Sequence, residues 1–255
     1  MIVNYYNSDK QTKKYLIIFY LIVFGHCVEL FAQSGEEKLK VVYKIGVKSD
    51  DDSKAAKHQA MIKKLYEAYA QLEFELVSDG KLGVYQYDKK LEVGESDIMY
   101  RLAMNHGGGN SIYYRTKEKK IQHIQNLGKK INVLYDPEEF NWEITKEAKN
   151  IKGYMCYKAV GYKEQYDSGR KKMLTFSPIA WFAPEINVPF GPKGIDGLPG
   201  LVLEGSMNGK LFFYADTIQM GTECNDRKEL KIQNGEEMSE KEYLELLQKM
   251  RPVNN

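Results

Sequence analysis

The stretch at residues 188–204 constrains the fold of this chain more than any other part of it. Glycines recur there at a spacing of three residues, with prolines between them: Gly191, Gly194, Gly197 and Gly200, with Pro189, Pro192 and Pro199. No helix tolerates so many breakers, and a central strand cannot accept the prolines because each removes a ladder hydrogen bond. The sequence therefore predicts a loop of fixed turns that runs into an apolar strand at 201–204.

Two interpretations of this loop are open. It either packs Leu198 and Leu201 into a core, where glycines permit close backbone approach, or it presents a binding surface made of Gly197, Leu198, Pro199, Gly200 and Leu201. A collagen helix is excluded because the triplets stop after the fourth. A phosphate-binding loop is excluded because its Lys-Ser/Thr end is missing.

The charge and composition of the chain point to one β-rich domain and away from nucleic acid. The 37 Lys and Arg residues balance 35 Asp and Glu residues, which leaves a formal net charge of +2. A nucleic-acid-binding surface usually carries a marked basic excess. The 43% hydrophobic content suffices for one sizeable core, and the 19 tyrosines suit half-buried strand faces. We expect a single domain at residues 33–255.

The N-terminal segment has the layout of a secretory signal peptide at residues 1–32. A basic region with three lysines precedes an apolar run at 15–24, and Ala32 offers a small residue for cleavage before Gln33. Two alternatives are a lipid anchor on Cys27 and a retained anchor helix. Cleavage predicts an exported protein of the periplasm or outer-membrane surface that is not integral to the membrane.

Two cysteines follow the predicted cleavage site, Cys156 and Cys224. They are too far apart for a Cys-x-x-Cys redox pair. An exported protein meets an oxidising compartment, which favours one structural disulfide between them. The alternative is two separate buried thiols.

The periodicity of the remaining sequence predicts a large curved antiparallel sheet with a helix near each end. Apolar residues recur at helical spacing at 55–72 behind a capping Ser53. A capping box at 239–242 opens a final helix. Strand-like segments separated by turns are expected between the helices: 39–47, 72–77, 82–87, 111–116, 119–125, 130–135, 140–145, 154–162, 170–176, 179–182, 201–205, 210–218 and 230–233. The segments 154–162 and 170–176 are expected to form a hairpin.

Several ordered motifs in the second half of the chain resemble one known family. They begin with the tryptophan segment at 141–159, continue through Gly169-Arg170 and 180–186, and end with Gly-Leu-Pro-Gly-Leu-Val at 197–202. This succession resembles the GLPGLI family of exported proteins from Gram-negative bacteria. Val202 stands for the final Ile of the family name, and residues 179–180 also differ slightly from the usual pattern.

The resemblance, which covers residues 140–204, transfers no catalytic residue, because the family has no established catalytic activity. Most matching positions are of types that shape turns or fill cores. Arg170 and Glu204 are exceptions, since they are charges within apolar strand segments. A buried ion pair between Arg170 and Glu204 is therefore a hypothesis.

The sequence carries no convergent catalytic or metal-binding motif. His-Glu-x-x-His and Gly-x-Ser-x-Gly are absent. His106 and the three glycines after it imitate an oxyanion loop, but without a nucleophile elbow they predict a flexible turn at 105–110. The aspartates at 50–52 lack the glycine and downstream glutamate of a calcium loop, and the acidic turn at 136–139 offers weak cation binding at most. We expect a non-enzymatic protein without cofactor or metal.

Two functional hypotheses follow. A long curved sheet with a helix near each end is similar in outline to the half-barrels of periplasmic lipoprotein carriers, which predicts carriage of an apolar ligand or lipidated partner. The alternative is an accessory protein that docks on an outer-membrane or secreted protein through the loop at 188–201. A large apolar cavity would favour carriage, whereas an exposed patch of Leu198 and Leu201 would favour docking.

Overall fold

The computed structural model describes residues 38–48, 56–88, 97–126, 128–167, 170–221 and 230–250. The predicted signal peptide, the capping Ser53 and Cys224 lie outside these ranges. The fold and sites below concern the described residues alone.

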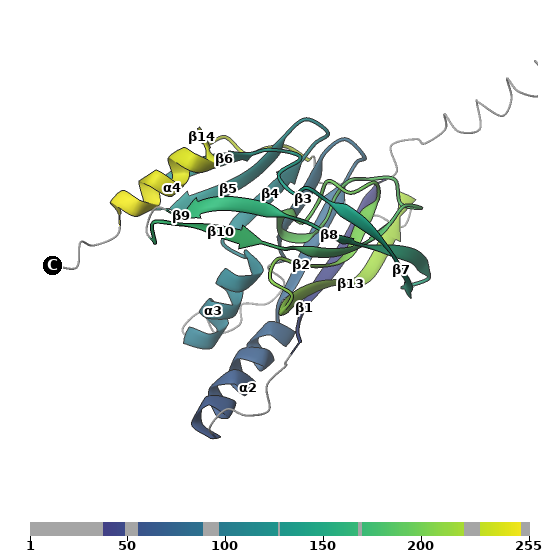
Figure 1. Cartoon of the computed structure of the whole chain (residues 1–255), viewed down its shortest axis with the longest axis horizontal. Coiled ribbons are helices and arrows are strands. Elements are labelled where there is room, and N and C mark those ends of the chain that lie inside the picture. The colour runs from purple at the N-terminus through teal and green to yellow at the C-terminus, as the bar shows by residue number, and fades with distance from the viewer. Residues whose placement is uncertain are drawn as a thin grey trace, which may run out of the picture. The chain divides into compact units, whose positions relative to one another are not determined.

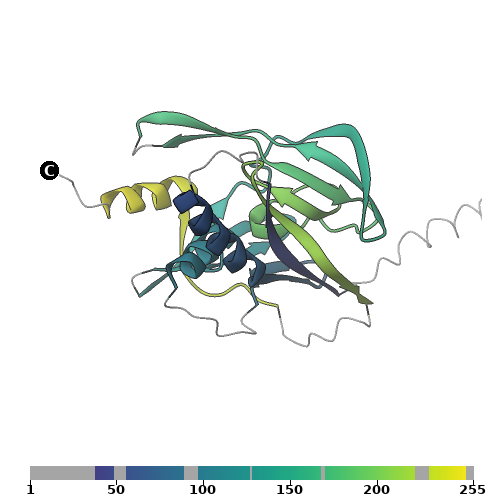
Figure 2. The same cartoon turned by 90° about the horizontal axis from the view of Figure 1, so that it is seen from below.

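The predicted curved β-sheet is confirmed. Twelve strands form one sheet in the order β14-β6-β5-β4-β3-β2-β1-β13-β12-β11-β8-β7, antiparallel except for the parallel pair β14 and β6. The sheet is curved but does not close, because β14 and β7 are its two free edges (Figures 1 and 2). Its strands are β1 (Leu39–Val47), β2 (Glu73–Ser78), β3 (Gly83–Tyr87), β4 (Ser111–Arg115), β5 (Lys120–Asn126), β6 (Lys129–Tyr135), β7 (Glu143–Ile151), β8 (Tyr154–Val160), β11 (Ile179–Ala183), β12 (Leu201–Ser206), β13 (Leu211–Met220) and β14 (Glu236–Ser239).

Strand β1 shows why these sequences form half-buried strands. Its burial alternates, so that Leu39, Val41 and Tyr43 are buried while Lys40 and Lys44 lie on the opposite face. A period of two is what the pleat of a strand produces. Because β1 pairs with both β2 and β13, its buried face lies in the middle of the core.

Three helices accompany the sheet within the described ranges. The two predicted helices are present as α2 (Ala56–Ala70) and α4 (Glu240–Lys249), and the predicted capping box of Ser239 and Glu242 opens α4. Figure 1 shows α2 and α3 together on one side of the sheet, and α4 beside β6 and β14. None of these helices is long and apolar enough to span a membrane.

Helix α3 (Ile98–Gly107) corrects the prediction of a flexible turn at 105–110. The Asp97 side chain accepts a hydrogen bond from the Met99 amide and begins the helix. Gly108 ends it in the left-handed conformation at φ 78° and donates to the carbonyls of Met104 and Asn105. The glycines that suggested a flexible loop therefore form the end of a helix.

Strand pairing around the second half of the sheet also differs from expectation. The predicted hairpin of 154–162 and 170–176 is wrong: β8 pairs with β7 and β11, whereas β10 (Lys172–Phe176) pairs with β9 (Lys163–Asp167) in a separate two-stranded sheet. The predicted last strand at 230–233 is irregular, and β14 begins three residues later. Alternation alone does not reveal which strands become neighbours.

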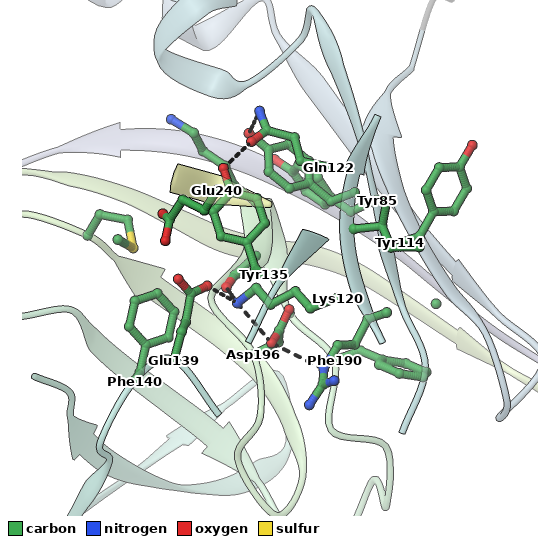
Figure 3. Close-up of a pocket in the computed structure, with 18 of the residues that line it drawn as sticks. Tyr85, Tyr114, Lys120, Gln122, Tyr135, Glu139, Phe140, Phe190, Asp196 and Glu240 are labelled. Atoms are coloured by element: carbon green, nitrogen blue, oxygen red, sulfur yellow. Dashed lines mark hydrogen bonds and ion pairs between the residues drawn. The ribbon is translucent and has the colours of Figure 1, made fainter. Parts of the chain in front are cut away.

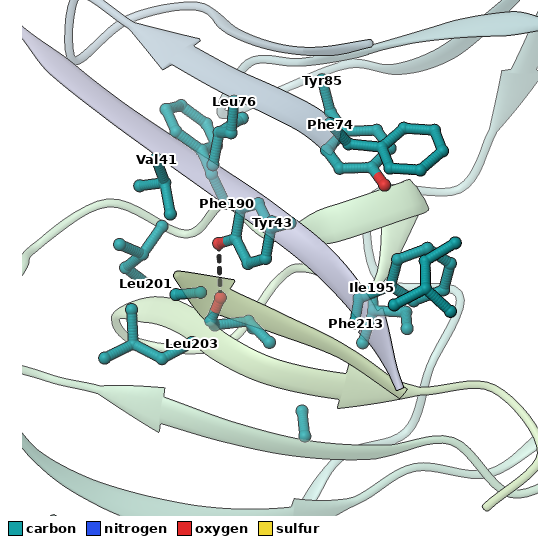
Figure 4. Packing of buried hydrophobic residues seen from close by; sticks show 14 of the residues in the cluster. Val41, Tyr43, Phe74, Leu76, Tyr85, Phe190, Ile195, Leu201, Leu203 and Phe213 are labelled. Carbon is teal, nitrogen blue, oxygen red and sulfur yellow. Dashed lines mark hydrogen bonds between the residues drawn. The ribbon is translucent and has the colours of Figure 1, made fainter. Parts of the chain in front are cut away.

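The glycine loop fills the inner side of the curved sheet. It leaves β11 and returns at β12, yet its single 3₁₀ turn, η1 (Pro192–Gly194), contacts the distant strands β3 and β4. Phe190, Ile195 and Leu198 are almost completely buried. The buried Tyr43 hydroxyl donates to the Val202 carbonyl at 2.6 Å (Figure 4). The loop thus connects the two halves of the sheet through its core.

Candidate ligand-binding site

A cavity of about 280 Å³ lies between strands β3–β6, the β9–β10 hairpin and the glycine loop. Figure 3 shows how its walls converge from these separate parts of the chain. Its lining is rich in aromatic rings: Tyr85, Tyr113, Tyr135, Phe140, Phe176 and Phe190. We refer to it as the aromatic pocket.

Strand register places the polar groups on the pocket wall. Tyr85 of β3, Tyr113 of β4 and Gln122 of β5 stand opposite one another on neighbouring strands. The Gln122 amide donates to the hydroxyl of Tyr113 at 3.3 Å and accepts from that of Tyr135 at 2.9 Å. The Tyr85 hydroxyl is buried and has no hydrogen-bond partner in the described structure, so the wall offers one unused polar group among apolar rings.

A buried ion network lies in the wall of the pocket beside the glycine loop. Lys120 is its centre: the Nζ atom lies 3.1 Å from Asp196 Oδ1 and 2.6 Å from Glu139 Oε1 (Figure 3). Arg115 Nε lies 3.3 Å from the same Asp196 oxygen. These four side chains are at most 10% exposed, and each charge therefore depends on its neighbour for compensation.

The network continues outward to the hairpin and the last helix. Lys163 of β9 lies 2.5 Å from Glu139 and 2.7 Å from Glu240 of α4. Three cations therefore alternate with three carboxylates, and the formal charges of the network cancel. Burial alone would lower the pKa of Lys163, but Glu139 and Glu240 hold it above its ordinary value. Burial also raises the pKa of Asp196, with Lys120 and Arg115 acting in the opposite direction.

Backbone contacts show that the network holds the loop in place. Lys120 Nζ also donates to the Gly194 carbonyl at 2.5 Å. The Trp142 indole donates to the Asp196 carbonyl at 3.0 Å. These two hydrogen bonds attach the loop to β5 and to the segment before β7.

Sequence reasoning missed these residues for an identifiable reason. Asp196 is a charged residue between the apolar residues Ile195 and Leu198, which are buried. A charge within an apolar segment is the signal that suggested Arg170 and Glu204, and it could have suggested Asp196 as well. The sequence around Glu139 predicts only an acidic turn. Lys120 is 76 residues from Asp196 in the chain, and no local pattern links residues so far apart.

The predicted ion pair of Arg170 and Glu204 is wrong. Glu204 pairs with Lys149, whose Nζ atom lies 2.8 Å from its Oε2, and Lys149 also lies over the Trp181 ring. Arg170 lies in the β9–β10 turn, is 67% exposed, and has Asp167 as its partner at 3.7 Å. Because Arg170 lies in this turn, it does not reach Glu204 on strand β12.

We expect Arg170→Ala to change the free energy of unfolding by less than about 0.5 kcal/mol, because exposed ion pairs contribute little. Lys149→Ala, the matched variant on the true partner of Glu204, should cost more because it also removes a cation–π contact with Trp181. Urea unfolding of the two variants checks this. A larger loss for Arg170→Ala would contradict the assignment.

The predicted binding surface of the loop is largely buried. Leu198 and Leu201 are 1% and 0% exposed, and Gly200 is buried as well. Only Gly197 and Pro199 are exposed among the five proposed residues. The two leucines therefore pack into the core, as the first interpretation of the loop predicted. The alternative prediction, in which they form an exposed docking surface, is wrong.

Cys156 is buried on strand β8, where its thiol donates to the Tyr154 carbonyl at 3.6 Å. Burial raises the pKa of this thiol to about 11, which keeps it protonated at neutral pH. The proposed disulfide with Cys224 stays a prediction, because Cys224 lies outside the described residues. Among the described residues no group of three or more ligating side chains is arranged to hold a metal ion.

Comparison with known proteins yields similarity in fold. A scan against models of known protein families finds no match, and a search of curated proteins finds no relative. The solved structures of PNGF-II in space groups C2 and P21 each align with 84% of this chain at a TM-score of 0.52 and 14% identity. The chain spans 33% of the length of those structures. This likeness shows the fold alone.

A conserved protein from Thermus thermophilus is a more distant structural neighbour. It aligns at a TM-score of 0.33 and 5% identity, over 80% of this chain and 91% of its own. A similarity at that level carries no argument about either fold or function. The site must therefore be interpreted from its own chemistry.

Proposed function

We propose that this protein binds a small, mostly apolar ligand in the aromatic pocket and acts as a binding protein rather than a catalyst. The observation that carries the proposal is the combination of an aromatic lining with an ion network whose six charges already neutralise one another. Rings such as Tyr135 and Phe140 provide large apolar contact areas. The carboxylates and cations of the network form ion pairs with one another. Apolar contact with the rings is therefore the main source of affinity for a ligand.

The size of the pocket favours a small ligand or one end of a longer one. At about 280 Å³ it lies near the lower limit of typical ligand sites, which enclose ~300–1,000 Å³. The unpartnered Tyr85 hydroxyl suits a ligand with one polar group. Membership of the GLPGLI family, export to the periplasm or outer-membrane surface, and carriage of a lipidated partner stay proposals that depend on sequence motifs.

The pocket favours carriage over the docking alternative. Docking through residues 188–201 required Leu198 and Leu201 at the surface, and both are buried. Native mass spectrometry on protein purified gently from its own cell envelope tests carriage directly. We expect a reproducible extra mass that extracts into organic solvent. A bare mass, or one that carries another polypeptide, would count against the proposal.

Phe176 allows a sharper test with a neutral fluorescent probe, N-phenyl-1-naphthylamine. Phe176 lines the pocket from β10, whereas Tyr166 on the paired strand is 55% exposed and lies outside the lining. We expect Phe176→Ala to weaken probe binding by about tenfold through lost ring contact, and Tyr166→Ala to leave it unchanged. Equal effects of the two variants, or no binding by the unmodified protein, would reject the pocket as the ligand site.

A further inference from the structure

A second cavity, of about 370 Å³, lies between α2, the C-terminal end of α3 and the η1 turn. Its apolar wall includes Ile62 and Leu65 of α2, with Val47 and Leu211 from the adjoining ends of β1 and β13. Ile62 and Leu65 are not fully buried. The apolar stripe of α2 thus partly faces this cavity.

The polar side of this cavity carries cations and no carboxylate. Lys193 and Lys210 line it together with His106, Tyr69 and Asn208, and none of the described residues that line it is acidic. No described carboxylate forms an ion pair with Lys193 or Lys210. The cavity therefore has an electrostatic character opposite to that of a cation site.

Lys193 is held at the cavity by an unusual backbone. It adopts the left-handed conformation at φ 50° and ψ 37° between Pro192 and Gly194, which is uncommon for a residue with a side chain. Its ammonium group donates to the His106 carbonyl at 2.5 Å, at the end of α3, and lies 5.7 Å from the centre of the Phe213 ring. An ammonium has three N–H donors, so two remain available to a ligand.

His106 adds a neutral donor beside Lys193. Its Nδ1 atom shares a short hydrogen bond with the Tyr69 hydroxyl. Burial and the nearby charge of Lys193 lower the pKa of His106 below its ordinary value, so the ring is neutral at pH 7. When Tyr69 donates to Nδ1, the ring proton resides on Nε2 and can be donated to a ligand.

The charge of Lys193 is unfavourable without an anionic partner. Burial lowers the pKa of Lys193 to about 8, because the ammonium has lost water and gained no carboxylate. A buried charge is stabilised by an opposite charge with which it can form hydrogen bonds. The binding of an anion would supply that missing partner.

We propose that this second cavity binds an amphiphilic anion, with a carboxylate or phosphate head at Lys193 and an apolar tail along Ile62 and Leu65. The site is separate in its chemistry from the aromatic pocket, whose six network charges cancel, although Lys193 borders both cavities. The head group is recognised by charge and by N–H donors, and the tail by the helix stripe. Failure of the aromatic-pocket proposal would leave this one standing.

Calorimetric titration of the purified chain with octanoate, octyl phosphate and 1-octanol tests the proposal. These probes share one tail length, so their comparison isolates the head group and distinguishes carboxylate from phosphate. We expect at least one anion to bind about tenfold or more tightly than octanol, as hydrogen bonds to charged groups provide. Equal binding of all three, or preference for octanol, would overturn the proposal.

Variants locate the site. Lys193→Met keeps an unbranched side chain one atom shorter and should remove the preference for the anion, whereas Lys172→Met on the exposed face of β10 should retain it. Lys193 also supports the end of α3, so thermal unfolding must show that the variant folds. If it does not fold, Lys210→Met replaces it as the test, because Lys210 lines the same cavity and is exposed. This variant should then weaken the preference for the anion. Anion binding that is unchanged in the folded variant would overturn the assignment.

The pH dependence adds a readout that a purely structural lysine would not give. Octanoate binding should weaken as the pH rises above about 8, because Lys193 then loses its proton. Among the groups that face it, His106 is already neutral above pH 7 and the pKa of Tyr69 is raised to about 12; Tyr66 and Lys210 complete the titratable lining. Octanol binding should stay constant over roughly pH 7–9. A flat octanoate profile would contradict a role for Lys193.

Discussion

Replacement of Lys120 by methionine should reduce the free energy of unfolding by about 3–5 kcal/mol, the loss that follows when one partner of a buried ion pair is removed. Lys120 lies within 3.1 Å of both Asp196 and Glu139 and also donates to the Gly194 carbonyl. Its removal leaves two buried carboxylates to share Arg115 and Lys163. Urea unfolding monitored by tyrosine and tryptophan fluorescence measures the loss.

Two further variants test whether the buried ion network is the cause of the stability loss in Lys120→Met. Lys158→Met removes a more exposed pair, with Glu147 at 2.7 Å, and should cost less than about 1 kcal/mol. The double variant Lys120→Met with Asp196→Asn should cost less than the sum of the single variants, because it removes one of the uncompensated charges. Equal losses for Lys120→Met and Lys158→Met would contradict the buried network as a determinant of stability.

Gly191→Ala should cost about 3 kcal/mol or more, at or beyond the upper end of ordinary overpacking. A Cβ atom at Gly191 would lie 2.0 Å from the Ile195 carbonyl oxygen and 2.8 Å from Val202 Cβ. The first of these contacts is with backbone, which cannot move aside as a flexible side chain can. Urea unfolding of the variant, compared with the unmodified protein, checks the prediction.

Gly153 provides the matched control, because an alanine there would strain the backbone without contacting any other atom. It has φ 93° in the turn between β7 and β8, and a Cβ atom there would meet nothing within 4 Å. Gly153→Ala should therefore cost only about 1–2 kcal/mol of conformational strain. Gly191 has an extended φ of −170° and no such strain. If Gly153→Ala were the more damaging change, close approach would not be the reason for Gly191.

The same loop therefore links stability and the proposed binding sites. Phe190 lines the aromatic pocket, Asp196 holds the ion network, and Lys193 reaches the second cavity. A substitution that displaces the loop should affect both cavities together. Loss of ligand binding in a loop variant is consequently informative only when its unfolding has been measured alongside.

Local features of the sequence predicted local structure well. Ser239 and Glu242 begin α4 as expected, because a capping box satisfies its donors within a few residues. The alternation of Leu39, Val41 and Tyr43 indicated a half-buried strand. Helix α3 was missed because the three glycines after His106 suggested flexibility, whereas Gly108 supplies the left-handed end that a helix requires.

Partners distant in the sequence could not be predicted in this way. Arg170 and Glu204 share the appearance of charges within apolar strands, yet they have different partners, Asp167 and Lys149. Each strand can in principle pair with several others, and the choice sets which side chains meet. The prediction was wrong because Arg170 lies in an exposed turn before β10 begins at Lys172, and because Glu204 of β12 meets Lys149 of β7.

The sequence by itself determined the mainly-β class, two of the helices and the loop of turns at 188–200 that leads into a strand, because capping, alternation and backbone stiffness act over a few residues. Only the tertiary structure decided where that loop lies and what it carries. Lys120 meets Asp196 across 76 residues, and Lys163 meets Glu240 across 77. Those contacts depend on the register of a twelve-stranded sheet and on the path of the loop through its interior, and both are set by the packing of the whole core.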